Sequence, residues 1–242
     1  MQTIGLIGGM SWESTLHYYR LINERVRERL GGLRSAQLLV HSVDFEPIAR
    51  MQADGRWDDA GAALAQAASG LERAGADFLV LATNTMHRVA GAVEAAVAIP
   101  LLHIADPTGA AIRRRSLRRV GLLGTRFTME QPFYRERLER GHGLEVLVPG
   151  EPERARIHAV IYDELCRGRV LEPSRDALRR IAAGLVDAGA EGIILGCTEI
   201  MMLLGPSDVA VPTFDTTALH AEGAVELALT TERASRPAPP RA

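Results

Sequence analysis

The chain has 242 residues with 28 basic and 30 acidic side chains, and all 28 basic residues are arginine. Without lysine it cannot form the aldimine of a pyridoxal-phosphate enzyme, act as a Schiff-base aldolase or carry a Walker-A phosphate loop. The formal net charge of -2 gives no general attraction to nucleic acid. The length suits one large domain or two domains of about 100–150 residues.

Cysteines, histidines and apolar runs exclude further classes. Two cysteines are too few for a disulfide scaffold, so we expect a cytoplasmic protein. The seven histidines show no metal-ligand spacing, so we expect no metal. No uncharged apolar run reaches the ~18 residues of a membrane span. One dense basic cluster is interpreted as a solvated helix end, namely Arg113, Arg114, Arg115, Arg118 and Arg119.

The first half of the chain alternates short apolar runs with amphipathic segments. Such runs are typical of buried parallel strands, and apolar residues every three or four positions are typical of helices. In chain order the pattern predicts a strand at residues 4–7, a helix at 14–30, a strand at 38–43, a helix at 57–74 and a strand at 78–82.

The second half follows the same alternation. It predicts a strand at residues 120–123, a helix at 134–140, a strand at 144–148, helices at 157–167 and 175–188, a strand at 193–196 and a last helix at 217–230. Strands that alternate with helices predict an α/β fold with parallel sheets covered on both faces.

The two halves repeat one plan. Three landmarks recur in the same order, at offsets of 116, 114 and 112 positions: residues 3–9 with 119–125, residues 74–85 with 188–199, and residues 99–102 with 211–214. A nearly constant offset indicates a duplicated α/β unit.

This repeat predicts the domain organisation. We expect a first domain of residues 1–105 plus 212–232, in which the last helix packs back onto the first sheet. Residues 106–211 form the second domain. The proline-rich tail at 233–242 is expected to be disordered.

Two residues at equivalent positions of the repeat are the candidates for chemistry. Thr83 and Cys197 each follow a buried strand, where ligands bind in open α/β sheets. If a pseudo-two-fold axis relates the domains, they form opposite walls of one cleft. A helix that starts at Cys197 would lower the pKa of its thiol. Cys166, inside a predicted helix, is interpreted as an inert core cysteine.

The motifs at these strand ends resemble a known family. The string at residues 4–15 followed by Tyr18-Tyr19, the string at 84–87 and the string at 195–200 resemble the aspartate/glutamate racemases, and the match runs from Thr3 to about residue 228. The resemblance implies two Rossmann-like domains around a cleft. It also implies racemisation by two bases without a cofactor, and a homodimer.

The family pair is two cysteines, one in each domain. The second corresponds to Cys197 and the first to Thr83, which resembles a branch associated with L-aspartate and L-glutamate. Cys197 would then abstract the α-proton of the L enantiomer. Thr83, or a water that it holds, would reprotonate the opposite face. Because threonine is a much weaker acid than cysteine, we expect a slow, direction-biased enzyme.

The acidic amino-acid substrate needs hydrogen-bond donors in place of a cofactor. The candidates for substrate binding are Met10, Ser11, Arg50, Gln52, Asn84, Thr85, Thr198 and Glu199, of which Gln52 and Arg50 rest on the resemblance. Glu199 and His87 could tune the acid–base groups beside them. Glu199 could equally be a helix-capping acid. The helix at 157–167 offers Glu164, Cys166 and Arg167 where some relatives use a lysine.

Two other functions stay open at this stage. A single catalytic cysteine also suits a decarboxylase or a cis–trans isomerase of a dicarboxylic acid on the same fold. A sensor without catalysis could use the same cleft. Loss of the α-hydrogen to D2O separates the racemase from both.

Overall fold

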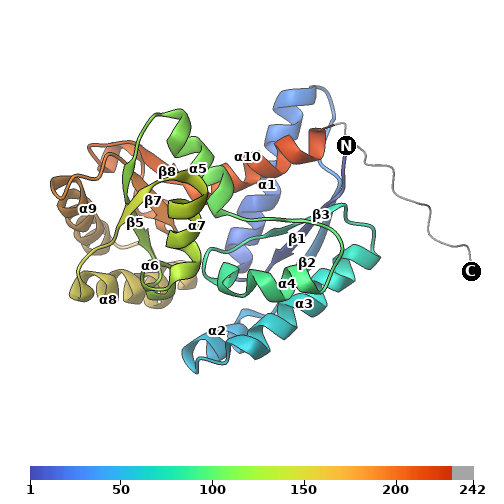
Figure 1. Ribbon diagram of the computed structural model, residues 1–242, viewed down its shortest axis with the longest axis horizontal. Helices are drawn as coiled ribbons and strands as arrows, with labels where there is room; N and C mark the ends of the chain where they lie inside the picture. Colours follow the sequence, from blue (N-terminus) through green and yellow to red (C-terminus); the bar gives the residue numbers. More distant parts are fainter. Residues whose placement is uncertain (231–242) are drawn as a thin grey trace, which may run out of the picture.

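The computed structural model describes residues 1–230, so the expected disordered tail at 233–242 lies outside the described residues. It contains two parallel sheets of four strands each, in the orders β2-β1-β3-β4 and β6-β5-β7-β8 (Figure 1). The α/β class is confirmed. The two strand orders are equivalent under the repeat, because each sheet places its first strand between its second and third.

The first sheet lies between two layers of helices, and successive side chains of its strands point to one layer and then to the other. It consists of β1 (Ile4–Gly8), β2 (Leu38–Ser42), β3 (Phe78–Leu81) and β4 (Leu101–Leu102), with helices α1 (Trp12–Leu30), α2 (Phe45–Ala53), α3 (Trp57–Arg73) and α4 (Ala90–Ala95). Leu6 packs toward α1 and the C-terminal helix, and Ile7 packs toward α3 and α4. Successive strand residues face opposite sides, so the apolar run is buried on both faces.

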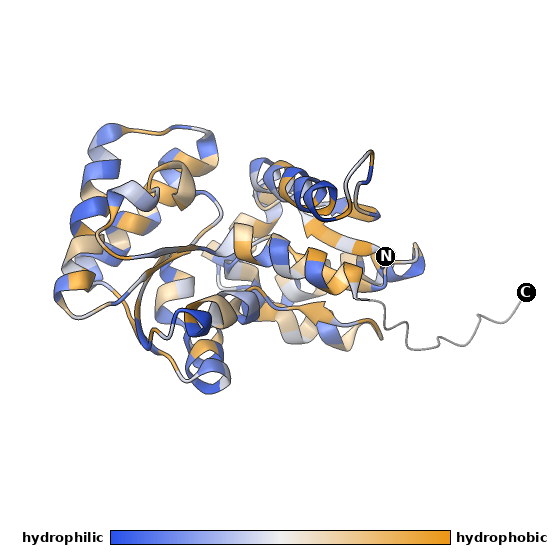
Figure 2. Ribbon diagram, turned by 90° about the horizontal axis from the view of Figure 1, so that it is seen from above, coloured by the Kyte–Doolittle hydropathy of each residue, from blue (hydrophilic) through white to orange (hydrophobic). Residues whose placement is uncertain are grey.

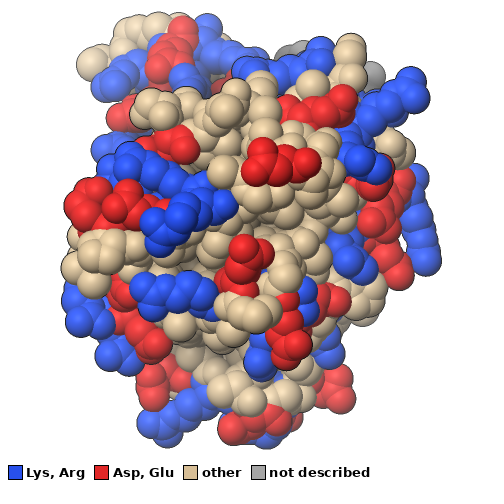
Figure 3. All heavy atoms as spheres, turned by 90° about the vertical axis from the view of Figure 1, so that its left-hand side faces the viewer, with Lys and Arg blue, Asp and Glu red and all other residues tan. Residues whose placement is uncertain are grey.

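The second sheet is built in the same way. It consists of β5 (Arg119–Gly124), β6 (Glu145–Leu147), β7 (Ile193–Gly196) and β8 (Thr213–Asp215), with helices α5 (Ala105–Arg114), α6 (Arg126–Glu130), α7 (Pro132–His142), α8 (Glu151–Ala159) and α9 (Glu172–Asp187). Figure 2 shows the hydrophobic colouring concentrated in the strands and the hydrophilic colouring on outer helical faces. On the face that this domain presents, basic and acidic side chains are interspersed (Figure 3).

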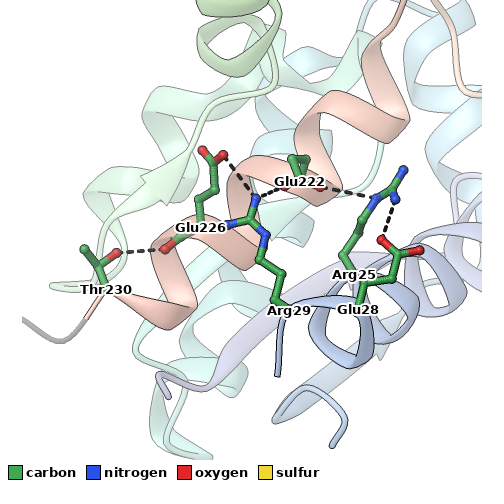
Figure 4. A network of polar contacts seen from close by, with 6 residues as sticks. All are labelled: Arg25, Glu28, Arg29, Glu222, Glu226 and Thr230. Carbon is green, nitrogen blue, oxygen red and sulfur yellow. Dashed lines mark hydrogen bonds and ion pairs between the residues drawn. The ribbon is translucent and has the colours of Figure 1, made fainter. Parts of the chain in front are cut away.

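The C-terminal helix α10 (Thr216–Leu229) leaves the second sheet and packs on α1 of the first domain (Figure 1). Arg25 and Arg29 of α1 pair with Glu222, and Arg29 lies 3.4 Å from Glu226 (Figure 4). These exposed pairs contribute little free energy. The strand β8 pairs with β7 of the second sheet, and α10 begins directly after it at Thr216. The domain boundary at residue 212 stays a prediction.

The short elements α4, β4, α6 and β8 were not among the predicted elements, and two longer segments also differ. The polar segment after β2 forms the helix α2, which the sequence pattern did not predict. The helix predicted at 157–167 begins earlier, as α8, and continues as a π-helical turn, η2 (Val160–Glu164), and a short 3-10 turn, η3 (Leu165–Arg167). Pro152 in the first turn and Glu153, which accepts from the Gly150 amide at 3.1 Å, define the earlier start.

Within residues 1–230, no helix is both long and apolar enough for a membrane span. In the same range, Arg113 and Arg114 are exposed and lie in the last turn of α5, as the solvated-helix-end interpretation predicts. The homodimer and the cytoplasmic location stay predictions.

Three buried histidines lie where the first domain meets α10 and the short segment between β4 and α5. The rings of His87 and His103 are 4.3 Å apart, and those of His87 and His220 are 5.9 Å apart. His220 donates to the Leu102 carbonyl and accepts from the Tyr18 hydroxyl. Burial lowers the pKa of His103 to about 2, that of His220 to about 4 and that of His87 well below its usual value. All three are therefore neutral in the folded protein at neutral pH.

This cluster predicts acid-sensitive stability. Unfolded histidines bind protons at their ordinary pKa near 6.5, whereas the folded ones do not, so stability is present above pH 6.5 and is lost as the pH falls. Three such groups give a slope of about 4 kcal/mol per pH unit near pH 5, at about 1.4 kcal/mol each. Urea unfolding at a series of pH values measures this slope.

The matched variants are His103→Gln, which removes one member of the cluster, and His41→Gln, which alters an exposed histidine. The first reduces the slope by about a third, and the second leaves it unchanged. Equal slopes in both variants would show that the cluster does not control acid unfolding.

Candidate active site

A cavity lies between the two domains, beyond the carboxyl ends of β1, β3, β5 and β7. It is narrow: the space between atoms is about 360 Å³ when its opening to solvent is included, and the centre of a water molecule can occupy about 20 Å³ of it. Ligands of parallel α/β sheets bind at this edge. The lining consists of Met10, Phe45, Gln52, Thr83, Asn84, Thr85, Thr125, Ile161, Tyr162, Cys166, Gly196, Cys197, Thr198 and Glu199.

Eight of the ten residues predicted for the site line this cavity: Met10, Gln52, Thr83, Asn84, Thr85, Cys197, Thr198 and Glu199. Ser11 lies behind it and contacts Glu199. Arg50 is not brought into the cavity. Its side chain is 71% exposed and pairs with Glu46 at 2.9 Å. Residues two positions apart in a helix point in nearly opposite directions. Because Gln52 faces the buried side of α2, Arg50 faces solvent.

The Glu199 carboxylate is the most heavily bonded group of the site. Its Oε1 accepts from the hydroxyls of Ser11 at 2.9 Å and Ser14 at 2.7 Å. Its Oε2 accepts from the Thr198 hydroxyl at 2.7 Å and the Cys197 thiol at 3.0 Å. The two serines belong to the first domain and the other two donors to the second. A buried carboxylate thus has four donors and connects the domains.

The start of α1 places the two serines. Gly9 has a φ of +90°, and a Cβ there would lie 2.1 Å from the Val43 carbonyl oxygen. The glycine therefore permits a sharp turn directly after β1. Its amide donates to the Thr15 hydroxyl at 2.7 Å. Ser11 then caps α1 by accepting from the Ser14 amide at 3.4 Å.

Cys197 does not have the electrostatic setting predicted from the sequence. It is followed by the 3-10 turn η4 (Ile200–Met202) rather than by an α-helix. Burial and the charge of Glu199 raise the pKa of its thiol well above the ordinary value. The prediction of a lowered pKa is wrong, because a three-residue turn supplies little dipole and the carboxylate lies within 3.0 Å of the sulfur.

Thr83 follows β3 and is buried at the edge of the cavity, with 7% of its surface exposed. His87 donates from Nδ1 to the Thr83 carbonyl at 2.7 Å and accepts the Ile104 amide on Nε2. Its tautomer is therefore determined by two backbone groups. His87 positions the main chain of Thr83 and does not contact the hydroxyl.

A second contact between the domains mirrors that of Glu199. The Thr85 hydroxyl lies 2.9 Å from that of Thr125, which caps α6. Thr85 and Glu199 are equivalent in the repeat, and each contacts the N-cap residue of the helix that follows the first strand of the other domain. Asn84 donates to Thr216 at 3.0 Å, while its Oδ1 has no partner among residues 1–230.

Several lining residues were missed by sequence reasoning. Tyr162 donates to Gln52 Oε1 at 2.7 Å and so connects η2 of the second domain with α2 of the first. Thr125 could have been found because it directly follows a predicted strand. Tyr162 gave no signal, because it lies within a predicted helix. Cys166 packs against the core of the second domain and also lines the cavity, and burial raises the pKa of its thiol.

The described residues, 1–230, bring together no group of three or more His, Cys, Asp or Glu side chains able to hold a metal ion. What the arrangement offers is a buried thiol beside a carboxylate, a hydroxyl from the other domain, and amide and hydroxyl groups around them. Such a site is suited to moving a proton at a bound small molecule.

The Cys197–Glu199 contact predicts how the thiol titrates. With Cys166→Ser as the background, Glu199→Gln removes one of the causes that raise the pKa of Cys197. The rate of alkylation by iodoacetamide then rises with pH at a lower pH than in the parent. Glu13→Gln, near the same edge, serves as the control and leaves the profile in place. An unmoved profile in Glu199→Gln would contradict the electrostatic role of Glu199.

Comparison with known proteins identifies relatives of the whole chain. A family model described as Asp/Glu/hydantoin racemase matches residues 7–224. A candidate Asp/Glu racemase from Yersinia pestis is 52% identical, with a TM-score of 0.88 over 95% of this chain and 100% of that one. An aspartate racemase homologue from Pyrococcus horikoshii is 37% identical, with a TM-score of 0.81 over 94% and 99%.

A curated relative is more distant. The broad-specificity amino-acid racemase RacX of Bacillus subtilis is 24% identical over 92% of this chain and 96% of its own length. The family model covers most of the chain, so the match identifies the family of the whole protein. The chain belongs to the Asp/Glu/hydantoin racemase family.

Proposed function

We propose that the protein racemises an amino acid without a cofactor, with Cys197 and Thr83 acting on opposite faces of the α-carbon. The observation that carries the proposal is their placement. They follow the equivalent strands β7 and β3, and they line one buried cavity between the domains. A proton removed on one side of a substrate held there is replaced from the other.

Cys197 begins as a thiol, because burial and the charge of Glu199 raise its pKa. Its proton points to Glu199 Oε2, which is a ready acceptor at 3.0 Å. A substrate ammonium bound nearby adds a positive charge that favours the thiolate. A thiolate with a high pKa is a strong base, which abstraction of a weakly acidic α-hydrogen requires. Substrate binding therefore activates the base.

Thr83 acts as the proton donor on the opposite face, either directly or through a water that it holds. A neutral hydroxyl is a poor base at rest, so it cannot readily take the α-proton of the D enantiomer. The pair is therefore asymmetric. Conversion from L to D starts at Cys197 and has the larger kcat. Because the two enantiomers have equal free energy, its KM is larger by the same factor and kcat/KM is equal in the two directions.

The substrate's charged groups find partners in the lining. Asn84 Oδ1 is a buried acceptor without a partner in the described chain, and it suits the α-ammonium group. The Thr85 hydroxyl is a donor for the α-carboxylate, because its bond to Thr125 can run in either direction. The Thr198 hydroxyl donates to Glu199 Oε2 and reaches the substrate only by giving up that bond. The sequence resemblance suggests L-aspartate and L-glutamate, whereas RacX is a broad-specificity enzyme, so both acids are tested beside other amino acids.

Exchange of the α-hydrogen in D2O, followed by proton NMR, tests the proposal. The parent protein exchanges the α-hydrogen of at least one L-amino acid, and Cys197→Ser lowers that rate by about 10³-fold or more. Cys166→Ser is the matched thiol control. Cys166 lines the cavity but takes no part in the proposed proton transfer, so this variant lowers exchange by less than about tenfold. Absence of exchange with every amino acid would favour the sensor. Loss of carbon dioxide without exchange would favour the decarboxylase.

The asymmetry predicts the effect of a second cysteine. Thr83→Cys places a stronger acid and better base on the D-side face, so exchange from the D enantiomer rises about tenfold or more. Exchange from the L enantiomer changes much less. Chiral chromatography of reactions started from each enantiomer gives the ratio of the D-to-L and L-to-D rates. An unchanged or lower D-to-L rate would mean that residue 83 does not face the α-carbon.

A further inference from the structure

The part of the cavity lining not assigned to the reaction is uncharged. We call this set the neutral wall: Phe45, Gln52, Ile161, Tyr162 and Cys166. The amide of Gln52 is 3% exposed, and Tyr162 donates to its Oε1 at 2.7 Å. Gln52 in turn donates to Met86 Sδ at 2.9 Å. The neutral wall therefore carries a hydrogen-bonding pair in otherwise apolar surroundings.

The charges around this wall are negative. Among the described residues, Glu199 is the one charged side chain of the lining, and no arginine or histidine lines the cavity. Glu164, two positions from both Tyr162 and Cys166, has a buried Oε2 without a partner in residues 1–230. A substrate with a second carboxylate would enter beside Glu199 and the Cys197 thiolate without a cation to balance it.

The hydrogen-bonding groups of the neutral wall also favour an uncharged side chain over a carboxylate. The Gln52 amide and the Tyr162 hydroxyl each donate and accept, so they match an amide or a hydroxyl, which also does both. A carboxylate only accepts. The bond from Gln52 to the methionine sulfur is weak, and a substrate oxygen can replace it without leaving a group unpaired.

The ring of Tyr162 is held in place from behind. It packs on His158 with ring centroids 4.7 Å apart, and His158 packs on Phe127 at 5.6 Å. Phe127 contacts Trp57 of the first domain at 5.1 Å. This row of rings crosses from one domain to the other, so packing between the domains helps to place the hydroxyl. The π-helical turn η2, a feature frequent at functional sites, presents the residue.

We infer that this site selects amino acids with an uncharged polar side chain over aspartate and glutamate, and that Tyr162 positions that side chain. The inference rests on the proposed racemase function. The sequence resemblance suggests the acidic amino acids as substrates. The charges of the cavity instead favour amino acids with an uncharged polar side chain.

Exchange of the α-hydrogen in D2O is measured for L-asparagine, L-glutamine, L-aspartate, L-glutamate, L-lysine and L-alanine. We expect kcat/KM for the better amide to exceed that for either acid by about tenfold or more, the effect of one unpaired buried group. Faster exchange with an acid, or with lysine, would overturn the inference and leave the racemase function standing. No exchange with any of the six would instead remove the proposed function.

Tyr162→Phe tests the positioning role, with Tyr19→Phe, an exposed tyrosine, as the control. The variant raises KM for the amide about tenfold, the value of one hydrogen bond, and leaves kcat nearly unchanged. L-alanine has no polar side-chain group, so its exchange is unaffected. Equal losses for the amide and alanine would show that Tyr162 is only structural and would overturn its assignment.

Discussion

The site depends on one buried carboxylate. Glu199 lies between the domains and accepts hydrogen bonds from Ser11 and Ser14 on one side and from Thr198 and Cys197 on the other. A buried charge is tolerated only when donors surround it, and these donors come from both domains. The same contact that joins the domains therefore also sets the electrostatics of the thiol. Separation of the domains would leave the carboxylate short of partners, so assembly of the site and closure of the cavity are coupled.

The duplicated fold explains why this arrangement arises. Each domain ends its first and third strands at the edge that faces the other, and the repeat pairs Thr85 with Thr125 as it pairs Glu199 with Ser11. Chemical asymmetry is then added at single positions of a symmetric frame. The first domain has the Thr83 hydroxyl at the position equivalent to the Cys197 thiol of the second. It has the neutral Thr85 at the position equivalent to the Glu199 carboxylate. The proposed direction of proton transfer follows from these two differences.

Much of the frame could be predicted from local sequence. Apolar runs that end in glycine marked β1 and β5, and the constant offset of the repeat marked the equivalence of β3 and β7. The residues that directly follow those strands were found for the same reason. The helix α2 and the π-helical turn η2 were not predicted, because neither has a periodic pattern that separates it from its neighbours. Tyr162 was missed with them.

The sequence alone determined six of the eight strands, their repeat and the residues at the strand ends, because these follow from hydrophobic periodicity and turn chemistry within short segments. Only the tertiary structure decided the environment of each group. The pKa of Cys197 is raised rather than lowered because burial and Glu199 outweigh any helix dipole. Arg50 faces solvent because Gln52 takes the buried side of α2. Electrostatics depends on what lies within a few ångströms in space, and those neighbours come from residues far apart in the chain.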